Sequence, residues 1–177
     1  MTKNKQNIII SENIRLRHPK HFDIGEKSVI DDYSYFSTKI KVGKYCHIAS
    51  GCSIAGGDEF NCRIGDYVSI SSGVKIWCES NDYINDLVIL NPENKNINDN
   101  PIKGDVEIGN MCGIGANSVI MPNNKIPEGT VIGALSFVPS NFKFKEWCVY
   151  AGVPIKFIKK RNKKNVLKQL ALLESNE

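Results

Sequence analysis

The amino-acid sequence predicts an all-β solenoid that is followed by a C-terminal α-helix, and three observations favour this class. Aliphatic residues recur every sixth position through residues 102–138, at Ile102, Ile108, Ile114, Ile120, Ile126, Ile132 and Val138. The residue after each of them is often Gly or Pro, and the residue four positions on is often small. A period of six is neither helical nor simply alternating, so each hexad is expected to be a short strand and a corner.

The alternation of side chains along a strand explains this pattern. Residues i and i+4 of a hexad point into the solenoid, where aliphatic groups fill the interior and small groups leave room near the corners. The same phase occurs earlier in the chain, at Ile24, Ile30, Phe36, Val42, Ile48 and Ile54. It slips by four residues between positions 56 and 63, and then resumes at Ile64, Ile70 and Ile76.

The column of aliphatic residues divides the chain into three parts. Residues 1–22 lack the column and are expected to be an N-terminal cap, with one or two strands between residues 7 and 17. Residues 23–154 are the solenoid domain, interrupted at residues 77–101 by a long Asn-rich and acidic loop, which is either functional or a disordered insertion. Residues 155–177 predict a basic helix with an apolar stripe at Val166, Leu167, Leu170 and Leu173.

Charge and cysteine content restrict the class of protein further. The formal net charge is +4, and the positive excess lies in residues 156–177, which hold seven Lys/Arg and two Glu. Such a basic patch is typical of a surface that binds a phosphorylated cofactor, nucleic acid or an anionic surface, or of a helix face that contacts only solvent.

No stretch is long and apolar enough for a membrane span or a signal peptide, so we expect a cytoplasmic protein. The six cysteines form no C-x-x-C pair, and Cys46, Cys52 and Cys112 at inward positions predict buried reduced thiols.

Four segments resemble the C-terminal half of the hexapeptide-repeat acyltransferases, which are left-handed parallel β-helix enzymes. They are IGNMCG at 108–113, IGANSV at 114–119, VIGA at 131–134 and AGVPIKFIKK at 151–160. The resemblance extends over about residues 24–160. It implies three hexads per coil, a homotrimer, and acetyl-CoA as co-substrate in a cleft between neighbouring subunits.

His47 is the candidate general base. Acyl transfer from a thioester needs a proton acceptor, and His suits neutral pH. His47 precedes the inward Ile48, so it should point outward. Its segment GKYCHIA, residues 43–49, resembles Gly-x-x-x-His-Ile-Ala in members that acetylate sugars, including nucleotide-linked 4-amino-4,6-dideoxy sugars. The alternative is an exposed histidine with no catalytic role, which we expect of His18 and His21.

The entry to the loop departs from the family pattern. Many members that acetylate sugar hydroxyls carry a basic His there, whereas this chain has WCESNDY at residues 77–83. Glu79 and Asp82 are the candidate proton acceptors in the loop, or they are simply solvated carboxylates. The missing His favours an amine acceptor over a hydroxyl, because an amine exposes a lone pair once it is deprotonated.

The resemblance also assigns residues to the cofactor. By position, the pantetheine arm would contact Gly115, Ala116, Gly133, Ala134 and Ser136. The phosphates would contact Lys156, Lys159, Lys160 and Arg161. Small residues permit close backbone approach and cations neutralise phosphate, although the small residues could equally serve the corner geometry alone.

The function implied by the resemblance is N-acetylation of a nucleotide-linked amino-deoxy sugar, such as a dTDP-4-amino-4,6-dideoxyhexose, for a surface polysaccharide. Transfer to a sugar hydroxyl is one alternative, and a non-catalytic binding module on the same scaffold is another. Zinc sites of the γ-carbonic anhydrase type need three imidazoles, and only His47 lies in the solenoid, so we expect no metal. No nucleic-acid partner is expected.

Overall fold

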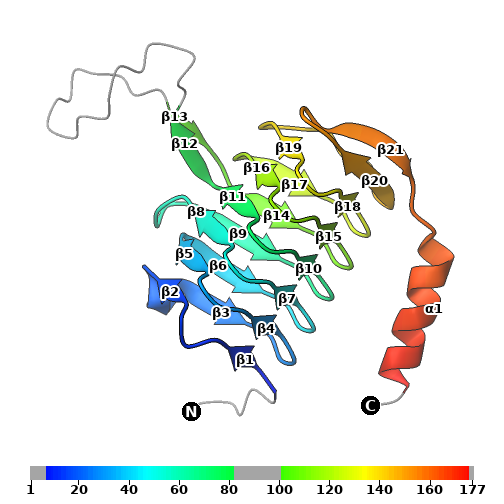
Figure 1. The fold of residues 1–177 in the computed structure, drawn as a ribbon, viewed down its shortest axis with the longest axis horizontal. Helices are drawn as coiled ribbons and strands as arrows, with labels where there is room; N and C mark the ends of the chain where they lie inside the picture. The colour runs from blue at the N-terminus through cyan, green and yellow to red at the C-terminus, as the bar shows by residue number, and fades with distance from the viewer. Residues whose placement is uncertain (1–6, 82–100, 176–177) are drawn as a thin grey trace, which may run out of the picture.

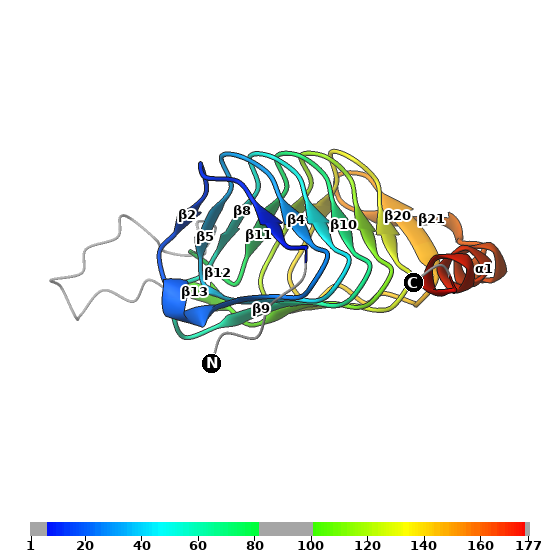
Figure 2. The same ribbon diagram turned by 90° about the horizontal axis from the view of Figure 1, so that it is seen from below.

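The structure is a computed structural model, and it describes residues 7–81 and 101–175. The chain winds through three parallel sheets that form the walls of a prism, and one helix, α1 (Lys163–Glu174), lies alongside (Figure 1). Figure 2 shows the coils stacked one behind another. The parallel β-helix with a C-terminal helix that the sequence predicts is therefore confirmed.

Each wall of the prism is one sheet, and each coil adds one strand to each wall. Sheet A contains β1 (Ile9–Ile10), β4 (Val29–Ile30), β7 (His47–Ile48), β10 (Ser69–Ile70), β15 (Gly113–Ile114), β18 (Val131–Ile132) and β20 (Cys148–Ala151). Sheet B contains β2 (Arg15–Leu16), β5 (Tyr35–Ser37), β8 (Ser53–Ala55), β11 (Lys75–Trp77), β16 (Val119–Ile120) and β19 (Phe137–Val138). Sheet C contains β3 (Phe22–Ile24), β6 (Lys39–Val42), β9 (Asn61–Ile64), β14 (Val106–Ile108) and β17 (Asn124–Ile126).

The predicted aliphatic column fills the prism. In sheet A, Ile48 pairs in register with Ile30 on one side and Ile70 on the other, so like side chains stack from coil to coil. These three residues are at most 1% exposed, and full burial of such a side chain contributes about 1.5–3 kcal/mol. The six cysteines are free and buried, as the small inward positions predicted.

The corners between sheets use a left-handed backbone conformation. We call the corner from sheet C to sheet A the CA corner; its residues with positive φ are Lys27, Tyr45, Tyr67, Met111, Gly129 and Trp147. The corner from sheet A to sheet B is the AB corner, with Tyr33, Gly51, Gly73, Asn117 and Leu135. At the CA corner from Tyr45 onward, and throughout the AB corner, these backbone N–H groups donate to the preceding coil, as Tyr45 does to the Glu26 carbonyl at 3.0 Å.

Two segments differ from the sequence prediction. Ile102 is not part of the internal column, because it lies in β13 (Pro101–Lys103), which pairs antiparallel with β12 (Glu79–Asn81). This hairpin is the base of the expected loop, whose residues 82–100 lie outside the described part of the chain. The hairpin leaves the prism between β11 of sheet B and β14 of sheet C (Figure 1).

The prediction of a basic helix from residue 155 is wrong for its first part. Residues 156–160 form β21 (Lys156–Lys160), which pairs antiparallel with β20 and so extends sheet A. The helix begins only at Lys163, where the Asn162 side chain accepts a hydrogen bond from the Asn165 N–H at 3.1 Å.

At the other end of the chain, the segment expected to cap the solenoid contains β1, β2 and the short helix η1 (Pro19–His21). Within the described residues, no helix has the length and apolar character needed to cross a membrane.

Candidate active site

His47 lies on the outer face of sheet A, as the alternation along β7 predicted. Its side chain is 50% exposed, and its Nε2 lies 2.8 Å from Oδ2 of Asp31. Asp31 directly follows β4, and its backbone N–H donates to the Ile48 carbonyl at 2.9 Å. This backbone bond holds the carboxylate one coil away from the imidazole. The result is a histidine–carboxylate pair beside the AB corner.

Sequence reasoning missed Asp31. The signal that could have found it is coil length, because His47 pairs in register with Val29, 18 residues earlier. Asp31 stands two residues after Val29 and is therefore one coil from His47. On the opposite side of β7, Ser69 of β10 is the partner in register with His47.

Glu79, one of the two candidate proton acceptors of the loop, does not join this pair within one chain. Glu79 lies in β12, where its Oε1 is 3.1 Å from Nζ of Lys103 on the neighbouring strand β13. Asp82 lies outside the described residues. The hairpin β12–β13 and strand β7 occupy different sides of the prism (Figures 1 and 2). A single site that uses both His47 and Glu79 therefore needs two chains.

The small residues assigned to pantetheine lie at the AB corner, where coils approach closely. The backbone N–H of Gly115 donates to the Ile132 carbonyl at 2.7 Å, so this donor is already used. A Cβ added at Gly115 would lie 2.3 Å from the backbone nitrogen of Ala134. Contact between coils is therefore sufficient to explain this glycine, and its role in cofactor binding stays a prediction.

Two other members of this set are also engaged by the fold. The carbonyl of Ala116 accepts the N–H of Leu135 at 2.8 Å. The Ser136 hydroxyl is buried, donates to the Gly133 carbonyl at 2.6 Å and accepts the Gly152 N–H at 3.1 Å. Its backbone is engaged as well, because its N–H donates to the Ser118 hydroxyl at 3.3 Å and its carbonyl accepts the Val119 N–H at 2.8 Å. A role of Ser136 in cofactor binding stays a prediction.

The basic residues assigned to the phosphates separate into two groups. Lys156, Lys159 and Lys160 are exposed along β21. Arg161 instead donates through Nη1 to the carbonyls of Met111 and Gly129, the second at 3.0 Å, so its guanidinium braces the CA corner. The sequence carries no signal for this brace, because its partners are backbone atoms. The three lysines are the groups that remain open to an anion.

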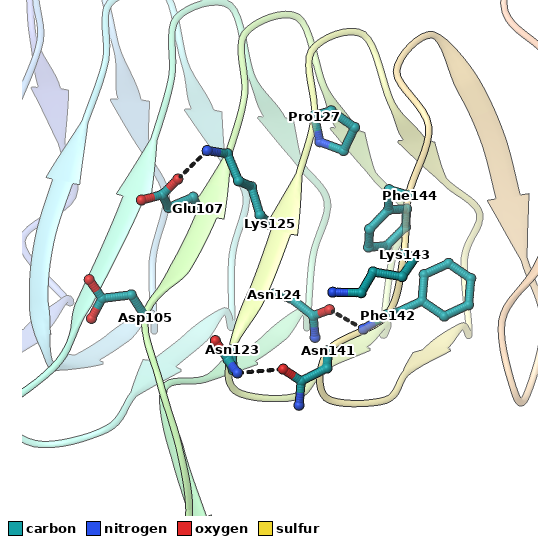
Figure 3. Close-up of a pocket in the computed structure, with 10 residues that line it drawn as sticks. All are labelled: Asp105, Glu107, Asn123, Asn124, Lys125, Pro127, Asn141, Phe142, Lys143 and Phe144. Carbon is teal, nitrogen blue, oxygen red and sulfur yellow. Dashed lines mark hydrogen bonds and ion pairs between the residues drawn. The ribbon is translucent and has the colours of Figure 1, made fainter.

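A hollow of about 500 Å³ lies on the outer face of sheet C (Figure 3). Most of its polar side chains already have partners in the protein. Glu107 pairs with Lys125 at 3.5 Å, and Asn124 accepts the N–H of Phe142 at 3.0 Å. These groups organise the corner after β17 instead of presenting free donors and acceptors. We therefore place the candidate active site on the His47 side of the prism.

The described residues were compared with the ligand sets that bind metal ions in proteins. Within residues 7–81 and 101–175, no group of three or more His, Cys, Asp or Glu side chains could hold a metal ion. The thiols near the core are poor ligands as well, because burial raises the pKa of Cys46 and Cys52.

Comparison with known proteins identifies similar acyltransferases. A dTDP-4-amino-4,6-dideoxy-D-glucose acyltransferase from Escherichia coli is 35% identical over 162 residues, which cover 90% of this chain and 82% of the relative. A probable macrolide acetyltransferase from Lysinibacillus sphaericus is 34% identical over 121 residues, covering 63% of this chain and 66% of the relative. No family model matches the chain.

A solved structure gives a similar result. AntD, an N-acyltransferase from Bacillus cereus in complex with dTDP and 3-hydroxybutyryl-CoA, superposes with a TM-score of 0.86 at 32% identity. The match covers 96% of this chain and 88% of AntD. A variant of AntD has been solved with dTDP-4-amino-4,6-dideoxyglucose and coenzyme A.

Proposed function

Because the chain belongs to the hexapeptide-repeat acyltransferase family, we propose that it transfers an acyl group from acyl-CoA to the amino group of a dTDP-linked amino-deoxy sugar. One observation carries this proposal. The similarity extends over 90% of the chain to a protein named for dTDP-4-amino-4,6-dideoxy-D-glucose, and over 96% to an N-acyltransferase solved with that sugar nucleotide. Acetyl is the donor group expected from the sequence, and 3-hydroxybutyryl is the alternative that the AntD complex adds. A surface polysaccharide remains the expected destination of the product, with the enzyme in the cytoplasm.

The proposed chemistry is direct transfer. The sugar amine attacks the thioester carbonyl, the carbon–sulfur bond breaks, and the amine proton passes by way of a base to the departing thiolate. His47 is the proposed base, since it is exposed at the surface and carries a carboxylate partner. The role of the protein is otherwise to hold the two substrates in line.

A homotrimer is part of the proposal. Glu79 belongs to β12 and His47 to β7, and these strands lie on different sides of one prism (Figures 1 and 2), so a site that combines the two residues draws on two chains. Large apolar side chains also stand in solvent at the AB corner, with Tyr33 75% and Leu135 68% exposed. Burial of such groups between subunits would stabilise the assembly.

Binding of the acyl-CoA phosphates is assigned to the lysines of β21. Lys156, Lys159 and Lys160 are exposed and clustered, and cations of this kind neutralise phosphate. Replacing Lys159 and Lys160 by Ala should raise the KM for acyl-CoA and leave the KM for the sugar nucleotide unchanged. A KM that does not move would exclude these lysines from the cofactor site.

The experiment that tests the function is a two-by-two turnover assay read by mass spectrometry. The donors are acetyl-CoA and 3-hydroxybutyryl-CoA, and the acceptors are dTDP-4-amino-4,6-dideoxyglucose and the matched sugar with a 4-hydroxyl. The expected product carries the acyl group on the amine only. Acylation of the hydroxyl sugar alone would overturn the assignment to nitrogen. A macrolide is assayed in parallel with the same donors, and its acylation without acylation of either sugar nucleotide would favour the activity named for the Lysinibacillus sphaericus relative.

A further inference from the structure

The histidine–carboxylate pair determines which imidazole nitrogen is free to react. Nε2 of His47 faces the Asp31 carboxylate at 2.8 Å, and an ionised carboxylate only accepts hydrogen bonds. Nε2 therefore carries the proton in the neutral ring, and the lone pair is left on Nδ1. The two nitrogens lie on opposite edges of the imidazole, so Nδ1 is turned away from Asp31.

The side of β7 that lies away from Asp31 is occupied by strand β10. Strand β7 lies between β4, which leads into Asp31, and β10, whose Ser69 pairs in register with His47. Neighbouring strands are separated by about 4.8 Å, so Ser69 is the next side chain along this face. Ser69 also lines a hollow of about 300 Å³ between sheet A and α1, together with Val166 and Leu170.

We propose that Asp31 is a positioning residue, which holds His47 with its reactive Nδ1 directed toward Ser69 and the hollow beneath α1. This inference rests on the proposed function, because it assigns the orientation of the base in that reaction. In the reaction, Nδ1 takes the proton from the sugar amine as nitrogen bonds to the thioester carbon. The same nitrogen returns the proton to the thiolate when the carbon–sulfur bond breaks.

The neighbouring carboxylate supplies a matched control. Asp32 accepts hydrogen bonds from the Ser11 hydroxyl and from Nδ2 of Asn13, so it faces the preceding coil. These bonds lower the pKa of Asp32, whereas the Asp31 carboxylate contacts His47. The two side chains are adjacent in sequence, but only Asp31 contacts the imidazole.

A role in stability alone would have small effects. The Asp31 and His47 side chains are 42% and 50% exposed, and ion pairs with this exposure contribute little to stability because solvent screens them. Asp31→Ala should therefore fold normally, with a melting temperature close to that of Asp32→Ala. A loss of turnover in the first variant but not in the second cannot then be attributed to unfolding.

The test combines kinetics with nitrogen NMR on the full-length protein. Asp31→Ala should lower kcat about 10-fold or more at unchanged KM, Asp32→Ala should not, and Asp31→Ala should add nothing in a His47→Asn background. The ¹⁵N shifts of His47 should show the Nε2–H tautomer in the wild type and a mixture of tautomers in Asp31→Ala.

Two results would overturn the inference, and they can be told apart. If the tautomer ratio is the same in Asp31→Ala as in the wild type, Asp31 does not hold the ring, whatever the enzyme's reaction is. If Asp31→Ala changes the ratio but kcat stays at the wild-type value while His47→Asn is impaired, the ring is held but its orientation has no catalytic role. Full activity of His47→Asn would instead remove the base from the proposed function.

Discussion

The CA and AB corners use the same backbone geometry and carry different side chains. At the CA corner, Tyr45 and Tyr67 stack with ring centroids 5.0 Å apart, and Lys27 donates to the Tyr45 hydroxyl at 2.6 Å. At the AB corner, Gly51 and Gly73 occupy equivalent positions. A positive φ favours Gly, yet Tyr45 and Tyr67 adopt it at the CA corner and Tyr33 adopts it at the AB corner. The left-handed turn therefore does not by itself determine the residue.

The two corners differ in what covers them. The chain's own C-terminus covers the CA corner, where Arg161 binds two corner carbonyls and Glu174 of α1 accepts the Tyr67 hydroxyl at 3.0 Å. The AB corner carries Asp31 and the neighbouring His47 and leaves Tyr33 and Leu135 exposed. One corner is closed by the fold, and the other is open to a ligand or to another subunit.

The largest expected effect is at Gly115, which leads into the AB corner, and Gly113 of β15 is its matched control. A Cβ at Gly115 would lie 2.3 Å from backbone, whereas at Gly113 the nearest atom is a Val131 side-chain carbon at 3.8 Å. Gly115→Ala should therefore cost more than about 3 kcal/mol in the free energy of unfolding. Gly113→Ala should be neutral or slightly stabilising. Urea unfolding measures both, and equal midpoints would show that the coils are not in close contact here.

The second effect concerns the inner side of the CA corner. Burial raises the pKa of the Cys112 thiol from 9.0 to about 11. Because the folded pKa is above the unfolded one, this stabilisation is complete below pH 9 and is lost as the pH rises toward 11. A shift of this size corresponds to about 2.7 kcal/mol. The free energy of unfolding of the wild type should fall more steeply between pH 8 and pH 11 than that of Cys112→Ala.

The comparison of these two proteins cancels the other groups that titrate at high pH. Cys112→Ala costs packing at every pH, so the absolute stabilities are not the measurement. Parallel curves for the two proteins would show that the thiol is not shielded from water at the CA corner.

Arg161 provides the third test, which separates bracing from cofactor binding. Its guanidinium donates to two corner carbonyls and lies over the Trp147 ring at 5.8 Å. Arg161→Ala should lower the free energy of unfolding by about 2 kcal/mol, as expected for hydrogen bonds to a charged group. Lys160→Ala is the control and should change stability by less than about 0.5 kcal/mol. If Arg161→Ala changes only the KM for acyl-CoA, the arginine is a phosphate ligand and the brace is secondary.

The repetitive part of the molecule could be predicted because each coil repeats the same requirement. An inward position such as Ile48 or Ile70 must fit the same narrow interior, so the period appears directly in the sequence. Ile102 shows the limit of this logic. It keeps the sixfold phase but lies in the hairpin, because spacing alone does not distinguish an internal strand from an arm that leaves the prism.

The site was predictable only in part, for a related reason. The outward direction of His47 follows from the pleat, but its partner Asp31 comes from the previous coil and requires the coil length as well. The contacts of Arg161 could not be predicted, since backbone carbonyls leave no pattern in the sequence. The strand β21 was missed because it pairs antiparallel with β20, and no sixfold pattern in the sequence indicates this pairing.

The smallest expected effect is at the outer end of the brace, where the Tyr67 hydroxyl donates to Glu174 at 3.0 Å. Both groups are exposed, so Tyr67→Phe should lower the free energy of unfolding by only about 0.5 kcal/mol. Its consequence should be local, with faster amide hydrogen exchange in the last turns of α1 and unchanged exchange in the coils. Glu174→Gln in the Tyr67→Phe background should add nothing, since the partner is already absent. If α1 exchanges equally fast in the wild type, the hydroxyl does not hold the helix and Arg161 alone closes the CA corner. The difference between the two corners would then depend on Arg161.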